Sequence, residues 1–112
     1  MDQTLSKHQR IKRWSELSRL LREGRAVRTD FWTLRWSPNA LGYPRLGVIT
    51  GKRLGSAPAR KRWRRLVREA FRRNKALIPK GLDLVVVPQA RPKELGYAEV
   101  ESKWLKMLRK LS

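Results

Sequence analysis

The sequence has 112 residues, with 28 Lys or Arg against 9 Asp or Glu, so its formal net charge is +19. This length suits one domain, and a hydrophobic content of 40% is enough for a core, which argues against wholesale disorder. Cysteine is absent and His8 is the only histidine, which excludes disulfides and cysteine zinc sites and disfavours histidine-based catalysis. The chain shows neither the ~20 apolar residues of a membrane span nor a secretory signal. We therefore expect a small cytoplasmic domain with a polyanionic partner.

The chain is predicted to begin with a polar segment and a short helix. Residues 1–10 are polar, and we expect them to form a flexible lead-in. Leucines at helical spacing predict an amphipathic helix over residues 15–23, with Ser15 as its N-cap and Gly24 as its stop.

Two strands are expected next. Residues 26–36 are rich in β-branched and aromatic side chains, which predicts a strand that could be split or bulged near residues 28–30. Turn-forming residues occupy positions 37–44, and residues 45–50 are the predicted returning strand. We therefore expect these two segments to pair as an antiparallel hairpin with a longish loop.

The second half of the chain contains the clearest helix. It is predicted to start after its cap, Ser56, and to run through Phe71, because its apolar residues keep spacings of three and four. Residues 82–88 are almost wholly apolar, as in a strand buried on both faces, and residues 98–111 carry the apolar stripe of a terminal helix. The α-β-β-α-β-α order predicts one α/β (α+β) domain over residues 1–112. We expect a two-layer sandwich whose mixed sheet pairs the strands around the second helix in parallel.

Positive charge is concentrated between Lys52 and Arg73. This stretch holds ten Lys or Arg and a single acid, Glu69, so it carries +9 of the net +19. Several arginines repeat every four residues away from the apolar stripe, where like charges repel one another. Such repulsion indicates a compensating anion, and the planar fork of arginine suits phosphates and bases. The alternatives are a solvated helix face and a membrane surface, which would require bulky apolar residues free to insert.

No catalytic site is expected on this chain. Residues 51–56 contain two glycines and a lysine but lack the spacing of a Walker A loop, although backbone N–H groups there could hold a phosphate. The acids are too sparse for the clustered carboxylates of two-metal phosphodiester chemistry. The five tryptophans are expected mostly in the core. Phe31 and Trp32 are predicted to point to opposite faces of the sheet, so that one of them could be an exposed stacking platform.

Residues 45–74, RLGVITGKRLGSAPARKRWRRLVREAFRRN, resemble the signature of the bacterial ribonuclease P protein subunit family. Lys61 departs from that signature, because the family usually has asparagine there. The resemblance also includes residues 10–13, the first helix, the two strands after it and residues 79–83. The positions that match the signature in register are Lys52, Arg53, Gly55, Ala57, Arg60, Arg62, Arg64, Arg65, Arg68, Glu69, Phe71 and Arg72.

The resemblance implies an accessory subunit of an RNA enzyme that removes the 5′ leader from precursor tRNA. The required Mg²⁺ would then belong to the RNA subunit, and no catalytic residue, metal site or cofactor is expected on the protein. The implied partners are ribonuclease P RNA and the single-stranded leader, with no membrane, and self-association is left open. The resemblance also implies a left-handed β-α-β crossover.

The site residues follow from the same resemblance. A cleft between the first helix and the sheet would hold the leader, lined by Leu17, Leu21 and Phe31; the family has aromatics at these places, so the two leucines weaken base stacking. Lys61 replaces an amide with a point charge and keeps only general phosphate attraction. The remaining alternative is a ribosomal-type structural RNA-binding protein without a role in tRNA processing. The residues that would bind RNA are Lys52, Arg53, Arg60, Lys61, Arg62, Arg64, Arg65, Arg68 and Arg72.

Overall fold

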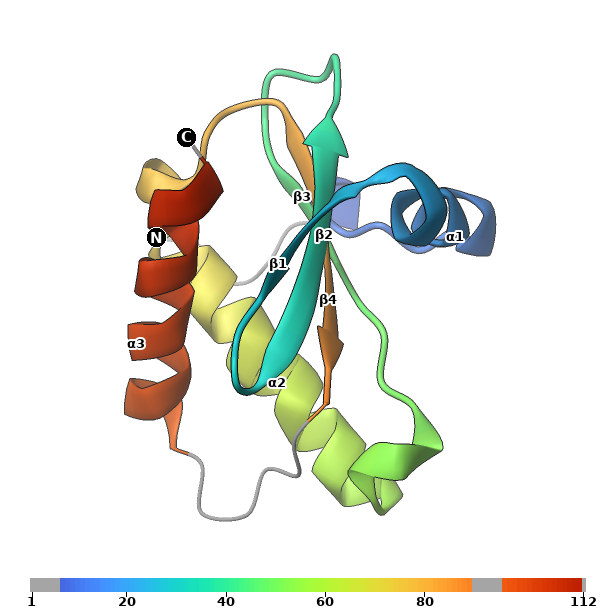
Figure 1. Cartoon of the computed structure of the whole chain (residues 1–112), viewed down its shortest axis with the longest axis vertical. Coiled ribbons are helices and arrows are strands. Elements are labelled where there is room, and N and C mark those ends of the chain that lie inside the picture. Colours follow the sequence, from blue (N-terminus) through green and yellow to red (C-terminus); the bar gives the residue numbers. More distant parts are fainter. Residues whose placement is uncertain (1–6, 90–95, 112) are drawn as a thin grey trace.

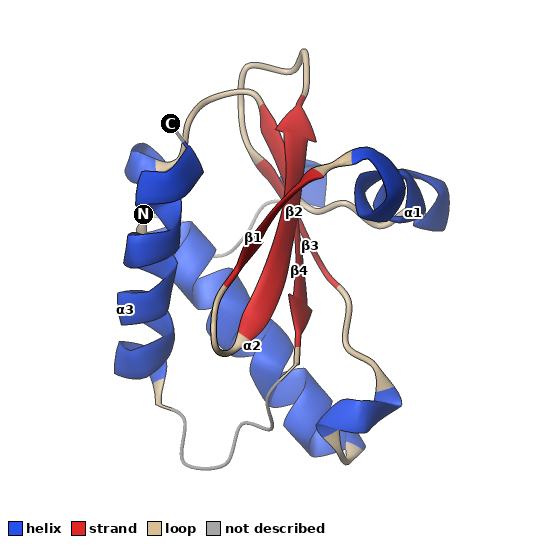
Figure 2. Cartoon of the chain, in the orientation of Figure 1, coloured by secondary structure: helices blue, strands red, loops and turns tan. Residues whose placement is uncertain are grey.

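The computed structural model describes residues 7–89 and 96–111, and within them it contains a four-stranded sheet and three α-helices (Figures 1 and 2). The predicted α+β class with a mixed sheet is confirmed, and the predicted strand over residues 26–36 is divided into two. In chain order the elements are α1 (Trp14–Glu23), β1 (Arg25–Arg28), β2 (Trp32–Pro38), β3 (Arg45–Val48), α2 (Ala57–Arg73), β4 (Leu82–Pro88) and α3 (Tyr97–Leu108).

The structure describes the predicted polar lead-in from Lys7 onward. Residues 1–6 of the predicted flexible segment lie outside the described residues. Lys7–Gln9 forms a 3₁₀ turn, and Arg10 then bridges Leu46 in parallel, with the Ile11 N–H donating to the Leu46 carbonyl at 2.9 Å. This segment therefore lies along the outer edge of β3, where it satisfies backbone groups that an edge strand leaves open.

The predicted hairpin between residues 26–36 and 45–50 is wrong. The first segment turns back on itself instead, so that β1 and β2 pair in antiparallel fashion. Thr29 closes this turn, because its Oγ1 accepts the N–H groups of Phe31 and Trp32, both at 3.1 Å. The split that was expected near residues 28–30 is therefore present.

The strand order is β1-β2-β4-β3, so β4 lies between the two strands that were expected to pair. It runs antiparallel to β2 and parallel to β3, and the parallel pairing around the second helix is confirmed. Leu84 and Val86 of β4 face one side of the sheet and Val85 faces the other, and all three are fully buried. An apolar strand of this kind belongs in the middle of a sheet, where both of its faces are covered.

The β3-α2-β4 crossover is left-handed, the rarer hand for parallel strands. Figure 1 shows the sheet nearly edge-on, with β1 and β2 in front and β3 at the back. Both β3 and β4 point downward in this view, and α2 returns upward on the left of the sheet.

Helices cover both faces of the sheet. The main core lies between the sheet and the pair α2 and α3, and it includes Trp32, Trp63, Phe71 and Trp104. A smaller cluster under α1, on the opposite face, contains Ile11, Leu20 and Val85, with Leu17, Leu21 and Ile49 packed around it. The expected two-layer sandwich is thus present and is extended by α1 on its other face (Figure 2).

The helix ends follow local chemistry, with one exception. Ser56 caps α2 as predicted, since its Oγ accepts the Ala59 N–H at 3.3 Å. Gly24 ends α1, donating its N–H to the Leu20 carbonyl at 2.9 Å. Ser15 is not a cap, because α1 already begins at Trp14 after Arg13, which makes no side-chain capping bond.

Candidate nucleic-acid interface

The two faces of α2 separate apolar packing from charge. Its apolar stripe is buried against the sheet and α3, and Trp63 is 0% exposed at its centre. Lys61, Arg62 and Arg65 are exposed on the outer surface. Arg60, Arg64 and Arg68 are half-buried along one flank of the helix. The amphipathic pattern therefore directs the predicted RNA-binding side chains outward.

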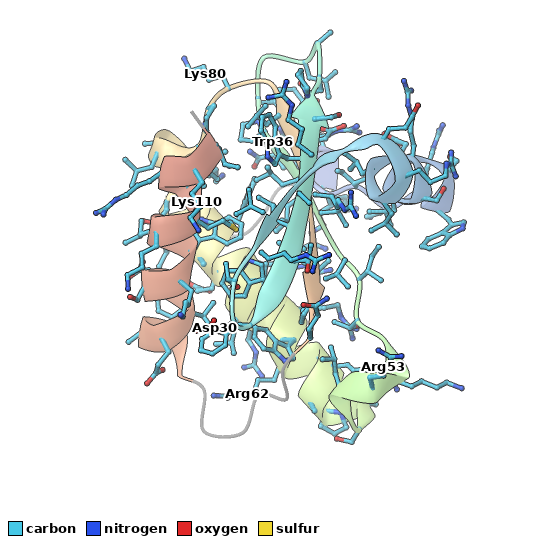
Figure 3. All side chains as sticks on the ribbon, viewed as in Figure 1. Asp30, Trp36, Arg53, Arg62, Lys80 and Lys110 are labelled. Carbon is cyan, nitrogen blue, oxygen red and sulfur yellow. The ribbon has the colours of Figure 1, made fainter. Side chains whose placement is uncertain are left out.

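The loop before α2 adds two more basic side chains. Lys52 and Arg53 are exposed on a 3₁₀ turn, whose next residue, Leu54, is buried and anchors the turn to the core. Gly55 follows with a φ of +111°, a conformation that side chains disfavour, and lets the chain enter α2 directly. Figure 3 shows Arg53 and Arg62 toward the same end of the molecule.

Three arginines gather beside the edge of β3. Arg64 is positioned by its Nη1, which donates to Thr50 Oγ1 at 2.7 Å. The pKa of Arg68 is lowered by burial and by the positive charges of Arg10 and Arg64. Arg10 reaches this place because its backbone pairs with β3. It belongs to the candidate site although sequence reasoning did not include it, since only the tertiary pairing brings it there.

Arg60, Arg64 and Arg68 of α2, together with the neighbouring Arg10, form a surface that we call the arginine flank. It carries hydrogen-bond donors without protein acceptors. Among the described residues, the Nε atoms of Arg10 and Arg60 are buried and lack a hydrogen-bond partner. A buried charged donor without a partner is costly. Phosphate oxygens would satisfy it and would also relieve the repulsion among the guanidinium groups. The flank therefore has the chemistry of a phosphate-binding surface.

Arg72 has a different environment from the other predicted RNA-binding residues. Its side chain is 13% exposed and forms an ion pair with Glu69. The neighbouring Arg73 also pairs with Glu69, at 2.9 Å, and its guanidinium lies 4.7 Å from the centre of the Tyr97 ring. The ion pairs of Glu69 therefore stay within the last turns of α2, and Arg73 also reaches α3, through the Tyr97 ring.

The three predicted cleft residues do not lie together. Leu17 and Leu21 are half-buried on the α1 side of the sheet, and Leu17 packs so closely over Gly47 that a Cβ there would overlap it. Phe31 packs instead on the main core, with its ring 6.4 Å from that of Trp63. Phe31 and Trp32 therefore share one side, because Phe31 belongs to the turn before β2 and escapes the alternation of the strand.

An ion-pair network joins α1 to the sheet. Arg45 Nη2 contacts Glu16 Oε2 and Asp83 Oδ2, both at 2.7 Å, while its Nε donates to Asp83 Oδ1 at 2.9 Å. The hydrogen bonds with Asp83 raise the pKa of Arg45, and burial opposes them. These residues line a cavity of about 410 Å³ at the end of the sheet. The charges here are paired within the fold, whereas the buried Nε atoms of Arg10 and Arg60 have no hydrogen-bond partner among the described residues.

Within residues 7–89 and 96–111, no group of three or more His, Asp or Glu side chains is arranged to hold a metal ion. None of the helices in that part of the chain is both long enough and apolar enough to cross a membrane.

The sequence and the fold of this chain match those of known proteins. The family model for ribonuclease P matches residues 5–112. The chain belongs to the ribonuclease P protein family. The ribonuclease P protein component of Thermotoga maritima is 30% identical over 115 residues, covering 99% of this chain and 98% of the relative. That of Syntrophus aciditrophicus is 34% identical over 97 residues, covering 87% and 82%.

Solved structures agree with this assignment. The ribonuclease P protein from Thermotoga maritima matches with a TM-score of 0.84 at 30% identity, covering 92% of this chain and 97% of that one. The ribonuclease P protein of Staphylococcus aureus matches in fold, with a TM-score of 0.82 at 24% identity, covering 93% and 95%. Membership gives the chain a general role in ribonuclease P, an endoribonuclease of tRNA processing, and implies ribonuclease P RNA as its partner.

Proposed function

We propose that this protein is the noncatalytic subunit of cytoplasmic ribonuclease P and promotes the 5′ maturation of precursor tRNA. In this proposal the loop at Lys52 and Arg53 and the exposed and flanking basic residues of α2 bind ribonuclease P RNA. The 5′ leader lies on the α1 side of the sheet, along Leu17 and Leu21. The Mg²⁺ ions of the reaction belong to the RNA.

The observation that carries the proposal is the arginine flank of α2. Burial lowers the pKa of Arg68, and the positive charges of the nearby Arg10 and Arg64 lower it further. The ion pairs of Glu69 are made with Arg72 and Arg73, at the far end of the helix. A stable fold tolerates such a cluster best when a polyanion binds it, because the bound phosphates offset the repulsion.

The assignment of the leader to α1 rests on geometry and charge. The half-buried Leu17 and Leu21 leave an apolar strip on α1, and Lys12 and Arg13 are exposed beside the start of that helix. An apolar strip flanked by cations suits an unpaired strand, whose bases pack against apolar surface while its phosphates meet the cations.

The test is cleavage of a precursor tRNA by a bacterial ribonuclease P RNA at low magnesium, with and without the protein. We expect the protein to stimulate cleavage only when the RNA is present, and the protein alone to be inactive. Cleavage by the protein alone would place catalysis on the chain. Tight, salt-sensitive binding to a cognate RNA without stimulation would instead indicate a structural RNA-binding protein.

A further inference from the structure

Trp14 is exposed, in contrast to the other tryptophans. Its relative exposure is 64%, although the sequence pattern predicted tryptophans mostly in the core. Trp32, Trp63 and Trp104 are 0% exposed, and Trp36 is half-buried with the Arg25 guanidinium 5.4 Å from its ring centre. All five lie within the described residues, so the exposed indole of Trp14 is the one that the fold does not explain.

The surroundings of Trp14 are positively charged. Lys12 and Arg13 precede it directly and are exposed, and no ion pair in the described part of the chain includes either of them. The first acid of α1, Glu16, is held by Arg45 at 2.7 Å. The start of α1 therefore presents a large aromatic surface next to two cations available for an anionic ligand.

Trp14 also continues the apolar strip of α1. Leu17 and Leu21 follow it at i+3 and i+7, positions that share one side of a helix. The leucines are half-buried against the sheet, while Trp14 stands beyond it in solvent. A strand lying along Leu17 and Leu21 would thus reach the indole at the start of the helix.

This combination favours RNA over other occupants. An indole stacks on any base, and neighbouring cations hold the flanking phosphates, which is how proteins bind unpaired strands. A membrane-inserting helix presents several bulky apolar residues on its free face, whereas the other large apolar residues of α1 pack toward the sheet. The net charge of +19 likewise complements a polyanion.

We propose that Trp14 stacks on an unpaired base of single-stranded RNA, with Lys12 and Arg13 holding the adjacent phosphates. This inference rests on the proposed function and extends its leader-binding surface. Because leucines line the strip at positions 17 and 21, Trp14 supplies the aromatic face that those positions lack. Its contribution depends on the base being present and unpaired and much less on which base it is.

The first experiment measures binding of a fluorescein-labelled eight-nucleotide RNA to the full chain by fluorescence anisotropy. We expect Trp14→Ala to weaken binding about fivefold or more and Trp14→Phe to stay within about twofold, since phenylalanine also stacks. Leu41→Ala is the matched control, because Leu41 is an exposed apolar residue in the loop between β2 and β3. Equal binding by Trp14→Ala and the wild-type protein would overturn the proposal.

Salt dependence separates stacking from charge. Trp14→Ala removes no charge, so the slope of log K against log salt should be unchanged, whereas Lys12→Ala combined with Arg13→Ala should reduce it by up to about 1.4. Replacing single nucleotides by abasic ones should weaken binding to the wild-type protein at the stacked position and leave Trp14→Ala unaffected there. The proposal would be overturned if each abasic replacement weakened RNA binding equally in the wild-type protein and in Trp14→Ala, at every position.

Two further outcomes distinguish this inference from its alternatives. If Trp14 governs binding of the eight-nucleotide RNA but the protein does not stimulate precursor cleavage, the stacking site stands and the proposed function fails. If cleavage is stimulated equally by the wild-type protein and Trp14→Ala for every leader length, the stacking site fails alone. A Trp14-dependent blue shift of fluorescence with phosphatidylserine vesicles but none with RNA would indicate a membrane contact instead and overturn the proposal.

Discussion

At the residue scale, arginine has two opposite roles in this molecule. Arg45 is 18% exposed and joins Glu16 to Asp83, so its charge is satisfied within the fold. Arg68 is crowded by Arg10 and Arg64, and burial and this crowding lower its pKa. The same side chain therefore stabilises the fold at one place and destabilises the unbound protein at the other, where an external anion would reverse the effect.

The arginine flank should determine the salt dependence of RNA binding. Arg64→Ala combined with Arg68→Ala should weaken binding to ribonuclease P RNA and reduce the slope of log K against log salt by about 1.4 to 1.8, because two phosphate contacts are lost. A charge-matched control removes Arg19 and Arg25, which lie on α1 and β1. An unchanged slope in the α2 variant, measured by filter binding between low and moderate salt, would contradict the assignment.

A second residue-scale prediction concerns the hydrogen bond between Tyr97 and Glu101. The Tyr97 hydroxyl donates to Glu101 Oε2 at 2.8 Å, and Asn74 donates to the same oxygen at 3.1 Å. The bonds from Asn74 and Tyr97 hold the pKa of Glu101 below its ordinary value of 4.5. Burial, followed by the bond to Glu101, raises the pKa of Tyr97 from 10.0 to about 12.

Because of these pKa shifts, the stability of the protein should fall both at low pH, through Glu101, and at high pH, through Tyr97. The Glu101 contribution is present above pH 4.5 and is lost as the pH falls through the lowered value. The Tyr97 contribution is present below pH 10.0 and is lost as the pH rises through about 12. The difference in melting temperature between the wild-type protein and Tyr97→Phe should therefore be largest between these limits and narrow outside them. A difference independent of pH would contradict this account.

At the element scale, α2 covers the core with its apolar face and presents its basic residues on the opposite face. Trp63 lies at the centre of its apolar stripe, with its ring 6.2 Å from Trp32 and 6.4 Å from Phe31. Because the backbone of one helix holds both faces, any loss of packing under Trp63 would also displace the arginines on the opposite side. Packing of α2 thus sets the geometry of the candidate interface.

Trp63→Ala should lower the free energy of unfolding by about 3 to 5 kcal/mol, because it leaves a large cavity in a fully buried site. Urea denaturation followed by circular dichroism measures this loss. Trp14→Ala is the internal control and should leave stability nearly unchanged, since its ring is 64% exposed. A Trp63→Ala protein that unfolds like the wild type but binds RNA poorly would show that the helix faces are assigned wrongly.

The position of α1 depends on Arg45. Arg45→Met should destabilise the protein by about 1 to 3 kcal/mol, because it leaves the carboxylates of Glu16 and Asp83 without their partner in a partly exposed site. In Arg45→Met, the rate of amide hydrogen exchange should increase more in α1 than in α2, relative to the wild-type protein. Arg19→Ala breaks only the exposed pair with Glu23 and should change stability by less than about 0.5 kcal/mol. Equal effects of the two variants would contradict an anchoring role for Arg45.

At the scale of the whole molecule, the net charge of +19 opposes folding. Raising the salt concentration should therefore raise the melting temperature, and sulfate should raise it more than chloride at equal ionic strength, because a divalent anion can bind the arginine flank. The increment specific to sulfate should shrink in Arg64→Ala combined with Arg68→Ala. Differential scanning calorimetry measures this, and equal increments from both salts would argue against an anion site.

The sequence allowed the order of most elements and the division of α2 into two faces to be predicted. Helical spacing, the Ser56 cap and the Gly24 stop depend on neighbours a few residues away, so they can be predicted from the local sequence. The signature at residues 45–74 also sufficed to identify the family, because it combines many positions in one register. The roles of the RNA-binding residues stay predictions.

Pairings between distant segments were decided only by the tertiary structure. The chain alone favoured a hairpin between neighbouring strands, but β4, apolar on both faces, takes the central place because that position covers both sides. The same folding packs Phe31 against the core and brings Arg10 to the arginine flank. Trp14 is left exposed beyond the end of the packed surface. Local pattern therefore determined the elements and their charged face, while burial over long sequence distances decided which side chains are available to an RNA.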